Sequence, residues 1–495
     1  MLEKLFKIKS RKAKLSLEII GGIMTFFAMI YIVPLNATLF SSMNATNEVG
    51  EVLGTMSMDG VFVATALISA IITMLMGFLA NMPIALSTGM GLNSFLTSTV
   101  SASLGFSWQE CMVLLFITGC IFLIFTITPA RNIIIGKIPQ QLRLIICASL
   151  GAFIAFVGLK NAAIVQADDA TFVKLGSLSQ PGVLIALIGI IIGLILMFLK
   201  TKKSIINTLA IPFAVVVAAI VGIIVTYSMS AAQGVDASII STSYNLPYFD
   251  NNWNPISRFE GFKDVIFFGA FAESGVNNDI GSLFVNVFTN PSSYAVIFCL
   301  FFVHLFDSTA TILSVGKDVG VIDDSGSFKQ RRVFFPDAIG SFICGPLGTS
   351  TITPFAESTV GVKVGAKTGL ASVVTGLMFL CTIFIYPIFS IFTAGSVVAP
   401  ALVLVGTLIF VNNLKFLSWD DAAISFVGFL GVIITVLTYS ISNGIGFSFI
   451  FYTIINLVRG RYKDNNVVTY VISGFFIISF VINEIIPLLE TAPTG

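Results

Sequence analysis

The sequence predicts an all-α polytopic membrane protein whose fourteen transmembrane segments form two inverted seven-helix repeats. Of the 495 residues, 56% are hydrophobic and only 10% are charged, whereas soluble proteins carry about 25% charged residues. Apolar runs of about 17 to 25 residues recur along the whole chain, and each can cross a hydrocarbon layer of roughly 30 Å as a helix. The positions of these runs and of the charges between them define the predicted organisation.

Fourteen apolar runs divide into two sets of seven at the longest loop. The runs begin near Leu17, Gly60, Ile84, Cys111, Leu142, Val183, Thr208, Tyr294, Val333, Ser350, Gly369, Val397, Ala422 and Asn443. Because seven is odd, the second set enters the membrane in the opposite orientation, as in the inverted repeats of secondary transporters. The predicted parts are a cytoplasmic basic arm (1–15), a first repeat (16–227), an extracellular loop with amphipathic segments (228–291), a second repeat (292–460) and a C-terminal apolar segment (461–495). Within that last segment, the run from Val467 to Leu488 either spans the membrane or lies along its surface.

The charges predict a multi-pass protein of the cell membrane with a cytoplasmic amino terminus. Lys and Arg residues in short loops stay on the cytoplasmic side. With spans that alternate from a cytoplasmic start, every Lys and Arg falls inside except Lys160, Lys174, Arg258 and Lys263. The basic amino-terminal arm is therefore interpreted as a topology signal and not as a surface for nucleic acid.

Motifs for several other kinds of chemistry are missing from the sequence. There is no G-x-x-x-x-G-K-[ST] phosphate loop and no G-x-S-x-G nucleophile motif, and His304 is the only histidine, which argues against multi-histidine metal sites. The six cysteines lie in or beside apolar runs without metal-ligand spacing, which favours packing and predicts no disulfide. We therefore expect no enzyme activity, cofactor or metal.

Two of the apolar runs contain residues that weaken a helix. The third run includes "STGMGLNSF" (87–95), and the third run of the second half includes "TITPFAEST" (351–359). Each places such residues just before a polar residue, Asn93 in one and Glu357 in the other. The pattern predicts broken helices whose backbone amides face a ligand, although Gly89 and Gly91 could instead serve close helix packing.

Ionisable residues in the middle of membrane spans are functional candidates, because each costs about 2.5 kcal/mol or more to insert. His304 and Asp307 are three residues apart in the eighth run, which places them on one helix face, and Glu357 lies in the tenth run. Asn93, Asp307 and Glu357 could converge on a small planar solute that has N–H donors and ring acceptors. A buried carboxylate can also take up and release a proton.

The other two polar candidates have weaker functional signals. His304 is either part of a proton relay or a contact between helices. Asp337 follows Pro336 at the start of the ninth run, where helix capping is a sufficient explanation. The predicted proton-coupling residues are therefore Asp307, His304 and Glu357.

Six stretches together resemble the azaguanine-resistance-type purine permeases of the xanthine/uracil permease superfamily of nucleobase–cation symporters. They are "NMPIALSTGMGLNSF" (81–95), "GLKNAAIV" (158–165), "LFDSTATILSVG" (305–316), "PDAIGSFICGPLGTSTITPFAESTVGV" (336–362), "AKTGLASVVTGLMFL" (366–380) and "LTYSISNGIGFSFI" (437–450). The resemblance covers nearly the whole chain. It implies a core domain of spans 1–4 and 8–11, a gate domain of spans 5–7 and 12–14, and short extended segments in spans 3 and 10 that hold the purine between them.

The resemblance also implies proton symport of adenine, guanine or hypoxanthine, and pairing of two copies through their gate domains. The binding carboxylates of the family fall on Asp307 and Glu357, and its span-3 asparagine falls on Asn93. The predicted substrate-binding set is completed by three residues of the broken segments, which are Gly91, Thr353 and Ser358.

The sequence departs from the family pattern beside the predicted pocket. Thr88 stands where the family has proline, Ala310 stands where it has glycine, and His304 stands where an acidic or neutral residue is expected. Which purine is carried, and whether the coupled cation is a proton or another cation, is therefore left open.

Other solutes and other kinds of membrane protein remain as alternatives. Related transporters of the same fold carry uracil, xanthine or anions such as sulfate, but an anion would require a positive site where this chain has two carboxylates. An ion channel would need a continuous polar pore, whereas the polar residues here cluster at one depth.

Overall fold

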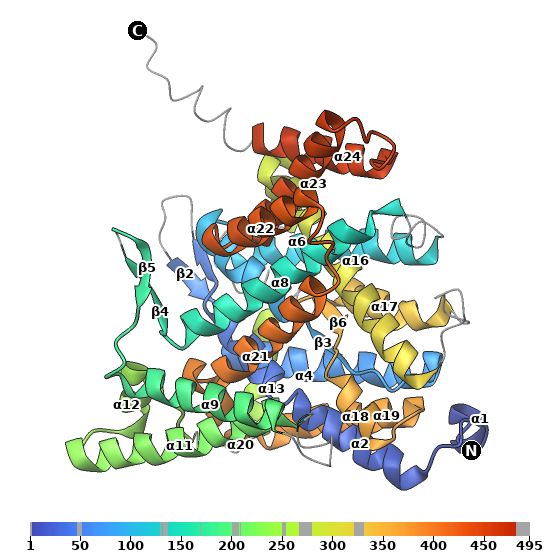
Figure 1. The fold of residues 1–495 in the computed structure, drawn as a ribbon. Helices are drawn as coiled ribbons and strands as arrows, with labels where there is room; N and C mark the ends of the chain where they lie inside the picture. The colour runs from blue at the N-terminus through green and yellow to red at the C-terminus, as the bar shows by residue number, and fades with distance from the viewer. Residues whose placement is uncertain are drawn as a thin grey trace.

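The computed structural model describes residues 2–46, 52–128, 131, 137–168, 170–199, 207, 209–249, 254–266, 280–320 and 331–481. Within these ranges the chain is a bundle of helices with three short two-stranded pairs (Figure 1). Some of the basic residues predicted to lie on the cytoplasmic side, namely Lys200, Lys202, Lys203 and Lys329, lie outside the described residues, as does the end of the last apolar run after residue 481.

The first half of the chain runs from the amino-terminal arm to a long apolar helix. Its helices are α1 (Leu2–Phe6), α2 (Leu15–Ala28), α3 (Ile32–Ser41), α4 (Met58–Leu75), α5 (Met90–Ser94), α6 (Trp108–Ile127), α8 (Gln140–Asn161), α9 (Pro181–Phe198) and α11 (Ala210–Gln233). The π-helical segments Met76–Ala80 and Phe95–Ser103 continue α4 and α5. Its strands are β1 (Asn44–Thr46), β2 (Val52–Thr55), β3 (Leu86–Thr88), β4 (Val165–Asp168) and β5 (Phe172–Leu175).

The second half follows a set of shorter helices. The connecting helices are α12 (Ala237–Tyr244), α13 (Pro255–Val265) and α15 (Ile280–Thr289). The later elements are α16 (Pro291–Val319), α17 (Phe335–Cys344), β6 (Ile352–Pro354), α18 (Ser358–Val364), α19 (Gly369–Phe384), α20 (Tyr386–Ser390), α21 (Gly395–Leu414), α22 (Ala422–Leu437), α23 (Ile441–Val458) and α24 (Val467–Phe480).

The predicted membrane-spanning character is confirmed, whereas the number of spans is not. Within the described residues, nine helices are long and apolar enough to cross a membrane, or ten if the pair bent by 93° after Phe384 is one span. The other predicted spans contain shorter helices, such as α17 and α22, or are broken, and the C-terminal apolar run contains the short helix α24. Length and composition therefore leave the count of fourteen as a prediction.

Small residues bring several helices into close contact. Where α8 packs along α21, a Cβ on Gly406 would lie 2.6 Å from the carbonyl oxygen of Gly151, so only glycine permits this approach. Close packing through small residues is a common source of stability between helices in a membrane. All six cysteines are free thiols.

The two broken runs meet as a pair of antiparallel strands in the middle of the bundle (Figure 1). β3 pairs with β6 so that Ser87 faces Thr353. On either side of the strands, the Gly89 amide donates to the Thr351 carbonyl and the Phe355 amide donates to the Ala85 carbonyl, each at 3.0 Å. Backbone groups must be paired where no water is present, and this pairing lets two short extended segments exist inside a helical bundle. The predicted breaks and extended segments are confirmed.

Candidate substrate-binding site

A cavity of about 290 Å³ lies where the two broken segments end. This volume is near the lower end of the range of ligand pockets, about 300 to 1,000 Å³. The broken segments contribute residues 89–92 and 353–357, α16 contributes Val303, Asp307 and Thr311, and Tyr31 lies between α2 and α3. The opposite wall comes from α8 and α21 and consists of Cys147, Leu150, Ile154, Leu402, Val405, Ile409, Asn412 and Asn413. A mostly apolar wall thus faces a wall that carries two carboxylates.

The start of α5 presents backbone amides to the cavity. Met90, Gly91 and Leu92 form its first turn, and the first amides of a helix have no partner inside that helix. A Cβ on Gly91 would lie 2.5 Å from the Cδ1 atom of Leu150, so glycine lets this turn approach α8. The arrangement supplies hydrogen-bond donors and the positive end of a helix dipole.

Glu357 lies at the start of α18 and reaches the cavity together with Tyr31. Tyr31 is 1% exposed, and its hydroxyl donates to the Oε1 atom of Glu357 at 3.0 Å. The break between α2 and α3 places this side chain there. The sequence interpretation missed Tyr31, although a tyrosine three residues before Pro34 in an apolar run was a signal that could have been used.

Asp307 reaches the cavity from the middle of α16, beside Thr311 one turn further on. Its carboxylate lies close enough to those of Glu357 and Asp337 to interact with them electrostatically. The structure therefore brings together the two carboxylates that the sequence singled out. Either one can accept hydrogen bonds from a solute in the cavity.

Asn93 is buried beside the cavity and is not part of its lining. Its Nδ2 donates to the Oδ1 of Asn36 at 2.6 Å, and the Nδ2 of Asn36 donates in turn to Thr65 and Thr349. This network ties α3, α4 and α5 to the segment before β6. Direct contact between Asn93 and a substrate stays a prediction, and Asn36 is a buried polar residue that the sequence interpretation did not consider.

The other two predicted binding residues differ in where their side chains lie. Thr353 lines the cavity, and a Cβ on Gly89 would lie 3.1 Å from the Thr353 side chain. The Oγ of Ser358 instead accepts a hydrogen bond from the Ala85 amide at 3.0 Å. Ser358 therefore fixes the crossing of the broken segments, and it is not part of the cavity lining.

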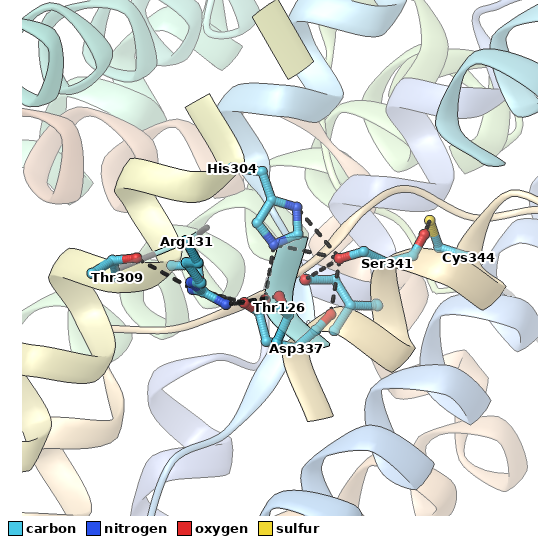
Figure 2. A network of polar contacts seen from close by, with 9 residues as sticks. Thr126, Arg131, His304, Thr309, Asp337, Ser341 and Cys344 are labelled. Carbon is cyan, nitrogen blue, oxygen red and sulfur yellow. Dashed lines mark hydrogen bonds and ion pairs between the residues drawn. The ribbon is translucent and has the colours of Figure 1, made fainter. Parts of the chain in front are cut away.

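His304 does not line the cavity; its side chain lies in a buried polar cluster (Figure 2). Its Nε2 lies 2.8 Å from the Oδ1 of Asp337, and its ring packs against Phe122 with centroids 4.0 Å apart. Arg131 contacts the other oxygen of Asp337 at 3.3 Å. His304 and Asp307 are therefore on the same helix, but His304 lies in the polar cluster and Asp307 lines the cavity.

The capping role expected of Asp337 is wrong. The helix α17 begins after Phe334 with no side-chain cap, and the Asp337 carboxylate is 0% exposed and bonded to Arg131 and His304 instead. A buried carboxylate is stable only when it is paired, and its partners come from distant parts of the sequence. Arg131, which the charge argument placed in a cytoplasmic loop, is itself buried at 2% exposure.

Replacing Tyr31 with Phe should weaken substrate binding about threefold to tenfold. The change removes the hydroxyl that holds the Glu357 carboxylate, and a net hydrogen bond contributes roughly 0.5–1.5 kcal/mol. Equilibrium binding to the purified protein measures the effect. Tyr452→Phe, a buried tyrosine of α23 outside the cavity, is the matched control and should bind as the parent does.

Broken helices that meet at a central cavity are typical of secondary transporters, and here two half-buried carboxylates, Asp307 and Glu357, line that cavity. The sequence comparisons agree with this class and make it specific. The chain belongs to the Permease family of xanthine/uracil permeases, whose family model matches residues 16–445. It is therefore a multi-pass membrane transport protein and not an enzyme.

Several named relatives align over almost their whole length. The guanine/hypoxanthine permease PbuO of Bacillus subtilis is 30% identical over 97% of this chain and 100% of its own. PbuG, a guanine/hypoxanthine permease of the same organism, is 33% identical over 94% and 96%. The adenine permease AdeQ of Escherichia coli is 31% identical over 97% and 96%.

Solved structures share the fold at low sequence identity. The transmembrane domain of the cyanobacterial bicarbonate transporter BicA aligns with a TM-score of 0.52 and 12% identity over 88% of this chain and 97% of its own. The murine anion transporter Slc26a9 aligns with a TM-score of 0.53 and 12% identity over 93% and 72%. At this identity the likeness shows a common fold, and the all-α transporter architecture predicted from the sequence is confirmed.

Proposed function

We propose that this permease imports a purine nucleobase, namely adenine, guanine or hypoxanthine, together with a proton. The observation that carries the proposal is the pair of carboxylates, Asp307 and Glu357, on the cavity wall that also holds the first turn of α5. The N–H groups of a purine can donate hydrogen bonds to carboxylates. Its ring nitrogens, or a ring carbonyl, can accept hydrogen bonds from backbone amides. One flat solute can therefore use both kinds of group at once.

Two aromatic side chains support a planar substrate. Phe355 and Tyr31 both line the cavity, and stacking of a base on an aromatic ring contributes roughly 1–3 kcal/mol. The named relatives are guanine/hypoxanthine and adenine permeases, which points to the same substrate class. In this proposal Glu357, Gly91 and Thr353 contact the base, while Asn93 and Ser358 hold the segments that present it.

The coupled proton is assigned to the buried ionisable groups. Asp307 is the proposed carrier, because it lies on the cavity wall beside other carboxylates. Glu357 shares the cavity, and His304 acts from behind it through Asp337. A carboxylate that is neutral in one state and ionised in another can couple solute movement to the proton gradient.

We also propose that the cavity lies between two domains of the membrane protein. The broken segments and α16 belong to the core of spans 1–4 and 8–11, and α8 and α21 belong to the gate of spans 5–7 and 12–14. Residues 16–227 and 292–460 form the two repeats. The protein lies in the cell membrane with its amino terminus in the cytoplasm, and two copies pair through their gate domains.

Cysteine labelling in intact cells tests this topology. In a chain whose six native cysteines are replaced, Lys174→Cys in the hairpin of β4 and β5 should react with a membrane-impermeant thiol reagent, because Lys174 lies in the exposed strand β5. Lys463→Cys, which is exposed after α23, should react only after the cells are opened. The reverse pattern at either position contradicts the proposed orientation.

Transport of an anion on the same fold is the alternative to be excluded. The amino-terminal end of α5 faces the cavity, which favours anions, but the two carboxylates oppose them. Membrane vesicles that contain the protein are given labelled adenine, guanine, hypoxanthine, uracil or sulfate, with and without a proton gradient. We expect at least one purine to accumulate only with the gradient, and uptake of uracil or sulfate without any purine would overturn the proposal.

A further inference from the structure

The buried cluster around Asp337 is joined to the turn of α16 that carries Asp307. Ser308, the next residue along the chain, is 0% exposed and points into the cluster. Its hydroxyl accepts a hydrogen bond from the Nη2 of Arg131 at 2.8 Å and donates to the Oδ2 of Asp337. Asp307 therefore faces the cavity, and Ser308, the next residue of the same helix, faces the cluster.

Arg131 connects three elements at this point. Besides Ser308 and Asp337 it contacts the hydroxyl of Thr309 at 3.2 Å, and its guanidinium lies over the rings of Phe122 and Phe334 at 4.9 and 4.3 Å. The planar guanidinium suits a site of this kind, because it donates several hydrogen bonds in fixed directions. Figure 2 shows Arg131 between Thr309 and Asp337. The cluster therefore fixes the rotation of α16 about its own axis at residues 308 and 309.

The charges of the cluster also bear on Asp307. Asp337 and Asp307 lie close enough to interact electrostatically, so an unpaired Asp337 would be a second buried carboxylate beside the first. Arg131 pairs with it at 3.3 Å, and this cation compensates the charge of the buried Asp337 carboxylate beside Asp307.

We propose that Arg131, Ser308 and Asp337 are positioning residues for proton coupling, which aim Asp307 into the cavity and keep the exchangeable proton on it. This rests on the proposed purine–proton symport, and it adds three residues that do not touch the substrate. None of them lines the cavity. Arg131 also lies in the chain between α6 and α8, so the cluster links the proton site to the connection between the proposed core and gate domains.

The test separates binding from accumulation. Purified Ser308→Ala and Arg131→Gln proteins should bind labelled purine within about threefold of the parent, because the base contacts other residues. In proteoliposomes with an imposed proton gradient, their steady-state accumulation should fall about tenfold or more, as expected when hydrogen bonds to charged groups are lost. A loss of binding together with accumulation would indicate a merely structural role and would overturn the proposal.

One further variant provides the control. Ser448→Ala removes a buried hydroxyl of α23 that bonds to the backbone of Gly444, away from the cluster and from the cavity lining, and it should accumulate purine as the parent does. Ser308→Ala is the smaller change and keeps the test decisive if Arg131→Gln fails to fold. Normal accumulation by Ser308→Ala also contradicts the proposal. Failure of the parent protein to accumulate any purine contradicts the proposed function instead, so the two failures are distinguishable.

Discussion

Replacing Glu357 with Gln should weaken purine binding about tenfold to a hundredfold. The Glu357 carboxylate lies at the start of α18 on the cavity wall and already accepts one hydrogen bond from Tyr31. Its remaining lone pairs are available to an N–H group of the base, and a hydrogen bond to a charged group contributes roughly 1.5–3 kcal/mol. Equilibrium binding of labelled purine to the purified protein measures the change.

The control for this substitution is Glu260→Gln, the same chemical change on an exposed residue of α13. It should leave the affinity unchanged. If Glu357→Gln binds purine as tightly as the parent does, Glu357 does not contact the base. The substrate would then have to be held by Asp307 and the backbone alone.

Replacing Asp307 with Asn should abolish accumulation of purine against a gradient while leaving much of the binding intact. The amide keeps the shape of the side chain and can still form hydrogen bonds, but it cannot take up and release a proton. Proteoliposomes with an imposed proton gradient should therefore fill only to the external concentration. Equilibrium binding to the same purified variant should stay within about tenfold of the parent.

Accumulation by Asp307→Asn at the parental level would show that the proton is carried elsewhere. Glu357, which shares the cavity, would then be the next candidate, followed by His304 through its bond to Asp337. Loss of both binding and accumulation would instead make Asp307 a direct ligand of the base. The paired assays distinguish these outcomes.

The breaks in the helices could be predicted because their cause is local. Glycine, proline and hydroxyl residues next to a polar side chain disfavour an uninterrupted helix wherever they occur, and the structure has β3 and β6 at those places. Ser87 lies opposite Thr353 in the strand pair. This register depends on the packing of two segments that are more than 260 residues apart in the sequence. No local pattern specifies it.

The polar contacts between distant helices could not be predicted for the same reason. In the sequence, Asp337 follows a proline and has the position of a capping residue. Its role in a buried cluster becomes visible only in the structure, where Arg131 and His304 contact it. The charge pattern predicts a cytoplasmic Arg131, because a position between two apolar runs does not indicate burial. The contact of Tyr31 with Glu357 has no local signature, because the two residues are 326 positions apart.

The most direct test of the account is a structure of the protein determined with a bound purine by electron cryo-microscopy. We expect density for a planar base between the first turn of α5 and Glu357, with an N–H nitrogen of the base about 2.7–3.2 Å from a carboxylate oxygen. We also expect Phe355 or Tyr31 to stack against the ring. A purine bound elsewhere, with no contact to Glu357 or to residues 89–92, would contradict the proposed binding site.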